Sequence, residues 1–336
     1  MKVLANSQNK VFITSSNKAI KSAEKLGISL SNFVGDVVSG TIFKPTELIV
    51  PDFTGVTDIS TDGLKWAFYG ERNVYNTITF PDLTTVSGSY ALAYAFQLNK
   101  TVTSFSFPEL VTITGGYSFY NFATSCPCTS INFPKLATVS AGYSFYSAFN
   151  NNSSITSVEY PALTTITGDY VFQMCHYNCS NLLSISFPEL TTINGNYVFT
   201  NGFSSNSKIT SISLPKLSTA NGNNVFSNAF SSNSVLETIT FPLLSSITGV
   251  STFSGAFTSC AKISSISFPA LTTSSFGSNV SQFSGMFNTS SGSTSLAITM
   301  HFPSNLSSTI SGLTGYPNFG ATAGRLTLVF DLPATS

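Results

Sequence analysis

The side chains best suited to chemistry in this sequence gather in one short segment, Cys175-His176-Tyr177-Asn178-Cys179. Thiolate sulfur and imidazole nitrogen are zinc ligands, and a cysteine beside a histidine can act as a nucleophile. A structural zinc site needs a fourth ligand, and a nucleophilic cysteine needs a base that a third group orients. The other thiol pair, Cys126 and Cys128, lies in a separate part of the chain. We therefore expect no metal site here and expect His176 to fill a core position.

Acidic side chains, which serve as general acids and bases, are scattered along the chain. Glycoside hydrolysis needs two carboxyl groups that flank one bond, whereas Glu109, Glu159, Asp169 and Glu189 lie far apart. The sequence has no P-loop and no G-x-S-x-G nucleophile motif. The second histidine, His301, stands in an alternating segment where we expect it to be solvated. These observations predict that the protein is not an enzyme, with no catalytic residue and no cofactor.

Binding chemistry suits the sequence better, because hydroxyl groups recur at fixed places before a series of prolines. The positions four and two residues before each proline carry Ser or Thr, with Asn132 and Glu159 as exceptions. If these positions face outward from strands, they form a wide and nearly uncharged ladder of hydroxyl groups. Ordinary solubility is the competing explanation. We predict that a partner binds here, through Thr77, Thr79, Ser104, Ser106, Ser130, Asn132, Ser157, Glu159, Ser184, Ser186, Ser211, Ser213, Thr238 and Thr240.

These hydroxyl groups are positioned by a sequence repeat that the prolines mark. From Pro81 to Pro269, successive prolines of the repeat are 27 residues apart, except for one interval of 26. A fixed period of this length predicts a solenoid, in which each unit buries its apolar face only against its neighbours. Such a stack favours an extended surface over a single catalytic pocket.

The apolar residues of each unit indicate its local structure. Before the proline they alternate with the hydroxyl residues, which is the period of a β-strand, and the proline ends the strand because it has no N–H for a ladder. After the proline, residues such as Leu190 and Ile193 predict a second extended segment. The glycine that follows, such as Gly195, indicates either a left-handed conformation or a close backbone approach at a corner. Two phenylalanines four residues apart, such as Phe199 and Phe203, then predict a short helix.

Stacked units of this kind predict an α/β solenoid with one parallel β-sheet, short helices on the opposite side and capped ends. The phenylalanines then align in columns, as Phe172, Phe199 and Phe226 should. Burying each ring stabilises the fold by roughly 1.5–3 kcal/mol, so the stack needs neither charge pairs nor disulfides. The chain has five cysteines, which we expect to be reduced and partly buried.

The order of strand, proline, glycine and phenylalanine resembles the leucine-rich repeats of the BspA-like, Treponema-type class. Ile185-Ser-Phe187-Pro188, Gly195 and Phe199 match the frame of that family, and the match extends over about residues 48–302. The repeat of 27 residues is longer than the family's, because a second phenylalanine and a Ser/Asn loop replace its Cys-ending turn. The resemblance implies a right-handed leucine-rich-repeat coil and a surface adhesin or protein-binding module of bacteria, protozoa or viruses.

The limits of the repeat divide the chain into three parts. Residues 1–44 lie outside the repeat and are expected to form an N-terminal module or attachment segment. Residues 45–302 are expected to form the solenoid, and residues 303–336 a C-terminal cap. Within that cap, residues 326–330 alternate and are expected to add an edge strand.

The N-terminal module has its own expected elements. Residues 11–13 and 28–30 are predicted strands, and residues 19–26 a short helix. A small non-repeating module without a signal peptide is similar to the ends by which phage appendage proteins dock on a virion. Residues 1–44 would then contact other virion proteins.

Composition excludes several classes of partner. Charged residues make up 8% of the chain, against about 25% in typical domains, and no cluster of cations suited to nucleic acid is present. No stretch of about 18 apolar residues exists, so we expect no membrane insertion. The first residues lack the apolar core of a signal peptide. We expect a virion or, by a non-classical route, a cell-surface location, and otherwise the cytoplasm.

Three functions stay open at this level. The first is a non-enzymatic recognition, adhesion or structural protein that binds a protein or glycan on a cell surface through the repeat array; a phage tail protein is one form of it. The second is an ice-binding protein, because regular rows of Ser and Thr can order water. The third is an intracellular scaffold.

Overall fold

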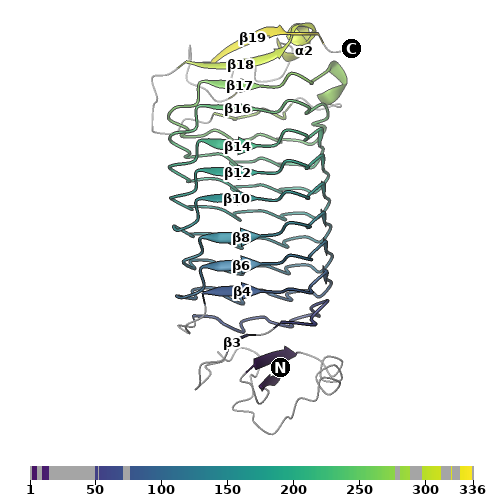
Figure 1. Cartoon of the computed structure of the whole chain (residues 1–336). Coiled ribbons are helices and arrows are strands. Elements are labelled where there is room, and N and C mark those ends of the chain that lie inside the picture. Colours follow the sequence, from purple (N-terminus) through teal and green to yellow (C-terminus); the bar gives the residue numbers. More distant parts are fainter. Residues whose placement is uncertain are drawn as a thin grey trace.

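The computed structural model of the protein is a column of coils stacked along one axis (Figure 1). It describes residues 2–5, 10–14, 50–51, 53–70, 76–276, 281–287, 297–311, 319 and 326–334. The predicted solenoid is therefore confirmed, and its coils follow the period of the prolines.

The first strand of each coil lies just before its proline and pairs in parallel with the equivalent strand of the next coil. These strands are β4 (Thr77–Thr79), β6 (Ser104–Ser106), β8 (Ser130–Asn132), β10 (Ser157–Glu159), β12 (Ser184–Ser186), β14 (Ser211–Ser213), β16 (Thr238–Thr240), β17 (Ser265–Ser267) and β18 (Ile298–Pro303). Ile185 faces Val158 in one neighbouring strand and Ile212 in the other, so the register preserves repeat positions. The ladder is interrupted twice, between β8 and β10 and between β14 and β16.

A second parallel sheet runs along the stack, formed by two-residue strands that follow the prolines. Its strands are β5 (Thr85–Val86), β7 (Thr112–Ile113), β9 (Thr138–Val139), β11 (Thr165–Ile166), β13 (Thr192–Ile193) and β15 (Thr219–Ala220). They pair without interruption from β5 to β15. The prediction of one parallel sheet was wrong, because the second extended segment of each coil forms a ladder of its own.

The third side of each coil is a ribbon of turns and not the predicted short helix. Every fourth residue there adopts a left-handed backbone, with φ of 56° at Tyr90 and 59° at Tyr94. The N–H of Ala93 closes a turn on Tyr90 O (3.1 Å), whereas the N–H of Leu92 donates to Ser118 O in the next coil (2.8 Å). An α-helix would keep these bonds within itself. The spacing of the phenylalanines misled us because a four-residue turn ribbon repeats as a helical face does.

The core consists of columns of aromatic rings that run through the stack. One column has centroid separations of 4.8–6.0 Å and contains Phe80, Phe107, Phe133, Tyr160 and Phe187. A second has separations of 4.9–5.7 Å and contains Phe119, Phe145, Phe172, Phe199, Phe226 and Phe253. Each of these side chains is at most 1% exposed. The predicted alignment of the phenylalanines is confirmed, at distances where aromatic rings attract one another.

The glycine corner brings the backbones of successive coils into contact. A Cβ on Gly222 would overlap the carbonyl group of Gly195, lying 2.5 Å from its carbon, and Gly195 meets Gly168 in the same way. Neither Gly195 nor Gly222 has a left-handed φ. Of the two reasons for a glycine here, the close approach is therefore the correct one.

At the N-terminal end, three short strands form a separate sheet. Strand β1 (Lys2–Ala5) pairs antiparallel with β2 (Lys10–Thr14), and β2 pairs in parallel with β3 (Val50–Pro51). The strand predicted at residues 11–13 is confirmed. The helix predicted at residues 19–26 and the strand predicted at residues 28–30 lie outside the described residues.

At the C-terminal end, strand β19 (Leu326–Leu332) pairs in parallel with β18, which confirms the predicted edge strand. His301 Nδ1 lies 2.9 Å from a carboxylate oxygen of Asp331 on β19. The side chain of His301 is 28% exposed, so it is only partly solvated, and the expectation of a solvated histidine is met in part. The helical pieces within the described ranges are short and lie near this end: η2 (Thr273–Phe276), η3 (Ser304–Leu306) and α2 (Ser307–Ser311). None of the helices in these ranges has the length and apolar character needed to cross a bilayer.

Candidate functional site: the hydroxyl face

The predicted binding residues occupy the outward positions of the first strands, on one side of the solenoid. In each strand from β4 to β16 on this side, a buried residue lies between two more exposed ones. In β12, Ile185 is 1% exposed and anchors the strand in the core. Ser184 faces Ser157 on one side and Ser211 on the other. The structure thus brings all the predicted residues into one surface, which we call the hydroxyl face.

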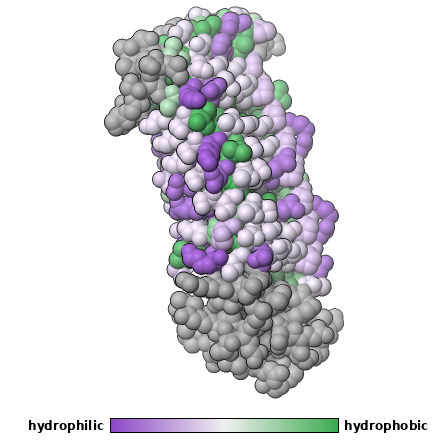
Figure 2. Space-filling model, turned by 60° about the vertical axis from the view of Figure 1, so that its left-hand side comes forward, coloured by the Kyte–Doolittle hydropathy of each residue, from purple (hydrophilic) through white to green (hydrophobic). Residues whose placement is uncertain are grey.

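The hydroxyl face is nearly free of charge. Glu159 is the single charged residue in the predicted set, and Ser130 Oγ donates to Ser104 Oγ at 2.9 Å across two strands. Figure 2, turned by 60° from the view of Figure 1, shows a surface that is mostly of intermediate hydropathy, with strongly hydrophilic or hydrophobic residues scattered among the coils. A partner of this face would meet hydroxyl dipoles and not a net charge.

Charged residues pair beside this face, where each strand ends at its proline. Lys135 Nζ lies 2.6 Å from the carboxylate of Glu109, and Lys216 Nζ lies 2.7 Å from that of Glu189. Each pair joins two neighbouring coils. Because the side chains are about half exposed, each pair stabilises the stack by no more than about 1 kcal/mol.

Hydroxyl groups on the second sheet are used differently. Thr164 Oγ1 donates to Ala137 O (3.1 Å), Thr191 Oγ1 to Thr164 O (3.2 Å) and Ser218 Oγ to Thr191 O (3.1 Å). This row of hydroxyl groups therefore bonds the backbone of the preceding coil. The contrast favours the hydroxyl face as the surface for a partner.

The Cys-His segment lies in the core. His176 is fully buried against Phe149, at 5.6 Å between ring centroids, and its Nε2 lies 3.0 Å from the hydroxyl of Tyr160. Burial lowers the pKa of His176 to about 3, so the ring is neutral at physiological pH. Burial likewise raises the pKa of Cys179 to about 12, which leaves little of the thiolate that a nucleophile requires. The predicted core role of His176 is confirmed.

The cysteines are free thiols, and all five are buried, more completely than the partial burial we expected. Across the residues that the structure describes, no three His, Cys, Asp or Glu side chains are grouped so that they could hold a metal ion.

Sequence reasoning missed a buried polar column at the position of three of these cysteines. This position, 18 residues after each proline, is at most 4% exposed and is occupied by Asn99, Cys126, Asn152, Cys179, Asn206, Asn233 and Cys260. The amide of Asn206 donates to the carbonyls of His176 (3.0 Å) and Phe203 (2.8 Å) and accepts the N–H of Cys179 (2.7 Å). The recurrence of Asn and Cys at one repeat position was the available signal.

A column of half-buried tyrosines on the turn ribbon was also missed. Ring stacks with separations of 4.6–4.8 Å and interplanar angles of 2–11° join Tyr90, Tyr117, Tyr143, Tyr170 and Tyr197. Lys65 Nζ lies 4.3 Å from the centre of the Tyr90 ring at one end. Within the column the ring faces cover one another, so it offers ring edges and hydroxyls to solvent. It does not offer the open ring faces on which a ligand could stack.

The repeat matches one known from other proteins. A family model described as a BspA type leucine-rich repeat region, in six copies, matches residues 65–201 and 146–291. Together these overlapping spans cover more than half of the chain. No curated protein matches the sequence.

Several solved structures are similar to the chain at low identity. A leucine-rich repeat protein of T. pallidum is 18% identical over 54% of this chain and 73% of its own, with a TM-score of 0.34. A leucine-rich repeat protein from Bacteroides ovatus is 16% identical over 83% of this chain and 76% of its own, with a TM-score of 0.37. A leucine-rich cell surface protein from Faecalibacterium prausnitzii is 13% identical over 84% and 90% of the two chains, with a TM-score of 0.25.

Proposed function

Because the chain belongs to the BspA-type leucine-rich repeat family, we propose that it is a non-enzymatic recognition protein. In this proposal the hydroxyl face binds a protein or glycan on a cell surface. Proteins of the family are typically surface or protein-binding repeat proteins. The observation that carries the proposal is the recurrence of outward hydroxyl residues from β4 to β16, which are in register within each of the three ladders that these strands form.

The size and chemistry of the face suit recognition. Seven strands at a ladder spacing of about 4.8 Å give a surface about 30 Å tall. Each strand has three residues and is about 10 Å long, so the strands alone offer roughly 300 Å². A standard interface takes roughly 800 Å² from each partner, so a partner would also contact the residues that flank the strands. Each hydroxyl both donates and accepts hydrogen bonds, so the face can complement a polar partner without charge pairing.

A charge placed on the face tests the proposal. The labelled full chain is measured for binding to intact bacterial and animal cells, and the variant Ser184→Lys/Ser186→Lys is compared with it. We expect the variant to lose at least tenfold in binding, because two ammonium groups would disrupt an uncharged contact surface. The control Thr114→Lys/Thr167→Lys places the same charges at exposed positions beyond the strands of the second sheet, and should bind as the wild type does.

Two results would count against the proposal. One is a folded wild-type protein that binds no cell surface. The other is an equal loss of binding in the face variant and in its control, which would point to a non-specific charge effect.

Ice binding is a second candidate, favoured by the register of hydroxyl motifs in neighbouring strands. Thr77 and Thr79 lie directly beside Ser104 and Ser106. Glu159 and the two interruptions of the ladder work against a regular lattice. Thermal hysteresis of a purified sample decides the matter, since its absence removes this function.

The attachment role of residues 1–44 in a virion and the location of the protein stay predictions. Strands β1 and β2 belong to that segment.

A further inference from the structure

A groove crosses the hydroxyl face between β14 and β16. Strand β14 pairs with β12, and β16 pairs with β17, but no ladder joins β14 to β16. The steps on either side are regular, with Thr210 N–H donating to Leu183 O and Ser264 N–H donating to Glu237 O, both at 2.9 Å. The equivalent bond from Glu237 N–H to Thr210 O is absent in this fully described region. Two strand edges therefore face each other with open backbone donors and acceptors.

The opening is confined to this face of the solenoid. On the second sheet the same two coils stay joined, since Thr219 and Ser246 form a bridge. In the core, Phe226 and Phe253 of these coils stack at 5.0 Å. The groove is thus a wedge in the surface and not a break in the stack.

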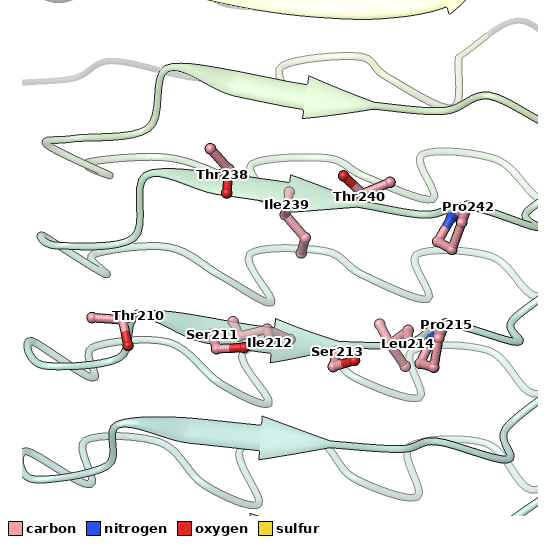
Figure 3. A pocket seen from close by; sticks show the side chains of 10 residues that line it. All are labelled: Thr210, Ser211, Ile212, Ser213, Leu214, Pro215, Thr238, Ile239, Thr240 and Pro242. Atoms are coloured by element: carbon pink, nitrogen blue, oxygen red, sulfur yellow. The ribbon is translucent and has the colours of Figure 1, made fainter.

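The walls of the groove combine hydroxyl groups with an apolar floor. Its cavity of about 300 Å³ has no charged side chain in its lining and carries the hydroxyls of Thr210, Ser211, Ser213, Thr238 and Thr240. Ile212 and Ile239 are 7% and 4% exposed, whereas Ile266, which lies between paired strands, is 0% exposed. Figure 3 shows the space between the two strands, with the side chain of Ile239 extending from β16 toward β14.

We propose that this groove binds a neutral carbohydrate, as a short segment of a linear glycan. The proposal rests on the proposed function of the hydroxyl face and specifies its ligand. Sugar hydroxyls both donate and accept, which is what two facing strand edges and five side-chain hydroxyls require. The C–H face of a sugar ring suits the apolar floor, and the absence of charge in the lining favours a neutral ligand.

The width of the groove argues against a peptide strand as its occupant. A strand inserted between β14 and β16 would need two ladder spacings, or about 9.5 Å. Cα atoms of these two strands already approach within 8 Å of each other. A cavity of about 300 Å³ lies at the small end of ligand sites, which suits a few sugar units.

The test measures binding of the full chain to an array of linear oligosaccharides of glucose, mannose, galactose and xylose, with sulfated and sialylated oligosaccharides beside them. The variant Thr240→Trp fills the groove with a bulky ring. Its control is Thr167→Trp, which places the same bulky ring at an exposed position beyond the second sheet and outside the hydroxyl face. We expect a neutral oligosaccharide to bind the wild type, Thr240→Trp to weaken this binding at least tenfold, and Thr167→Trp to leave it unchanged.

Thermal unfolding of each variant shows whether it is folded. If Thr240→Trp fails to fold, Thr238→Val removes one rim hydroxyl without added bulk and should weaken binding severalfold. Binding of acidic oligosaccharides alone, or equal weakening by Thr167→Trp and Thr240→Trp, overturns the proposal. If cells bind the protein but no neutral oligosaccharide does, the groove proposal fails and the proposed function stands. If nothing binds, both fail.

Discussion

The buried asparagines join the returns of successive coils through their side-chain amides. Asn206 makes three such hydrogen bonds, to groups in its own and the preceding coil. Cys260, at the equivalent position, has its sulfur 2.9 Å from Phe230 O, so its thiol can donate one bond there. A short polar side chain is required because a buried backbone group left without a partner costs roughly 1–3 kcal/mol.

The variant Asn206→Leu tests this requirement. It removes the partners of Cys179 N–H and of His176 O, whereas Phe203 O keeps the amide of Asn233 as a donor. We therefore expect it to lower the free energy of unfolding by roughly 3 kcal/mol or more. The variant Asn206→Cys, which copies the residue of the preceding coil, should lose clearly less stability. Urea denaturation measures both, and a leucine variant as stable as the wild type would contradict the role of the column.

The buried histidine makes stability depend on pH. The folded protein keeps His176 neutral because burial lowers its pKa to about 3, while the unfolded chain takes up a proton near the ordinary value of 6.5. Between these pH values the unfolded state binds more protons than the folded state. The contribution of His176 to the free energy of unfolding is therefore complete above pH 6.5 and falls as the pH decreases. The slope for one such group is up to about 1.4 kcal/mol per pH unit.

The double variant Tyr160→Phe/His176→Phe isolates this effect, because it replaces both hydrogen-bonding partners by apolar rings. Its free energy of unfolding should fall less than that of the wild type between pH 6.5 and pH 4, by roughly 1 kcal/mol per pH unit. Carboxylates titrate in both proteins and cancel in the comparison. Urea denaturation at several pH values gives the two profiles, and parallel profiles would refute the assignment.

At the scale of the element, the turn ribbon and the glycine corner both bring the backbones of successive coils into contact. The ribbon uses left-handed residues such as Tyr117 and Tyr143, although this conformation costs an L-residue roughly 1–2 kcal/mol. In return, alternate N–H groups reach the next coil, as that of Tyr117 reaches Gly142 O at 3.0 Å. The tyrosine stack adds ring contacts at the same positions.

Two alanine substitutions separate close approach from flexibility at the corner. Gly222→Ala places a Cβ on the carbonyl group of Gly195, so we expect it to destabilise the fold by about 1–3 kcal/mol or more. Gly116→Ala meets only Gly142 O at 3.7 Å and should stay within about 0.5 kcal/mol of the wild type. Thermal and urea unfolding compare them, and equal effects would argue against backbone contact as the cause.

At the scale of the whole molecule, the stack behaves as a linear array in which each coil contacts its neighbours. Equivalent residues of adjacent coils occupy equivalent places, so a coil can be removed if the register is kept. Deletion of residues 196–222 joins Gly195 to Asn223, which repeats the natural junction of Gly195 with Asn196.

We expect the variant that lacks residues 196–222 to fold. Its free energy of unfolding should depend less steeply on urea concentration than that of the wild type, because unfolding the shorter chain exposes less surface. Deletion of residues 196–208 shifts the register by half a coil and should prevent cooperative folding. Circular dichroism and urea denaturation compare the two, and a folded half-coil deletion would contradict the array description.

The period, the outward hydroxyl groups and the aromatic columns were all predictable from the sequence. Each depends on a local pattern that recurs once per coil, such as Ser184 and Ser186 around Ile185 or the phenylalanines at Phe172 and Phe199. When coils stack in register, residues at one repeat position line up as a column in the core or a row on the surface. This alignment does not depend on the backbone conformation of the segments that connect them.

The turn ribbon, the second sheet, the asparagine bonds and the groove were decided by the tertiary structure. Each depends on which backbone groups of two different coils meet, as Leu92 N–H meets Ser118 O and as β14 fails to meet β16. Side-chain spacing within one coil is the same for a helix and for a four-residue turn ribbon. Only the hydrogen bonds between coils distinguish them, and these form after the coils are stacked.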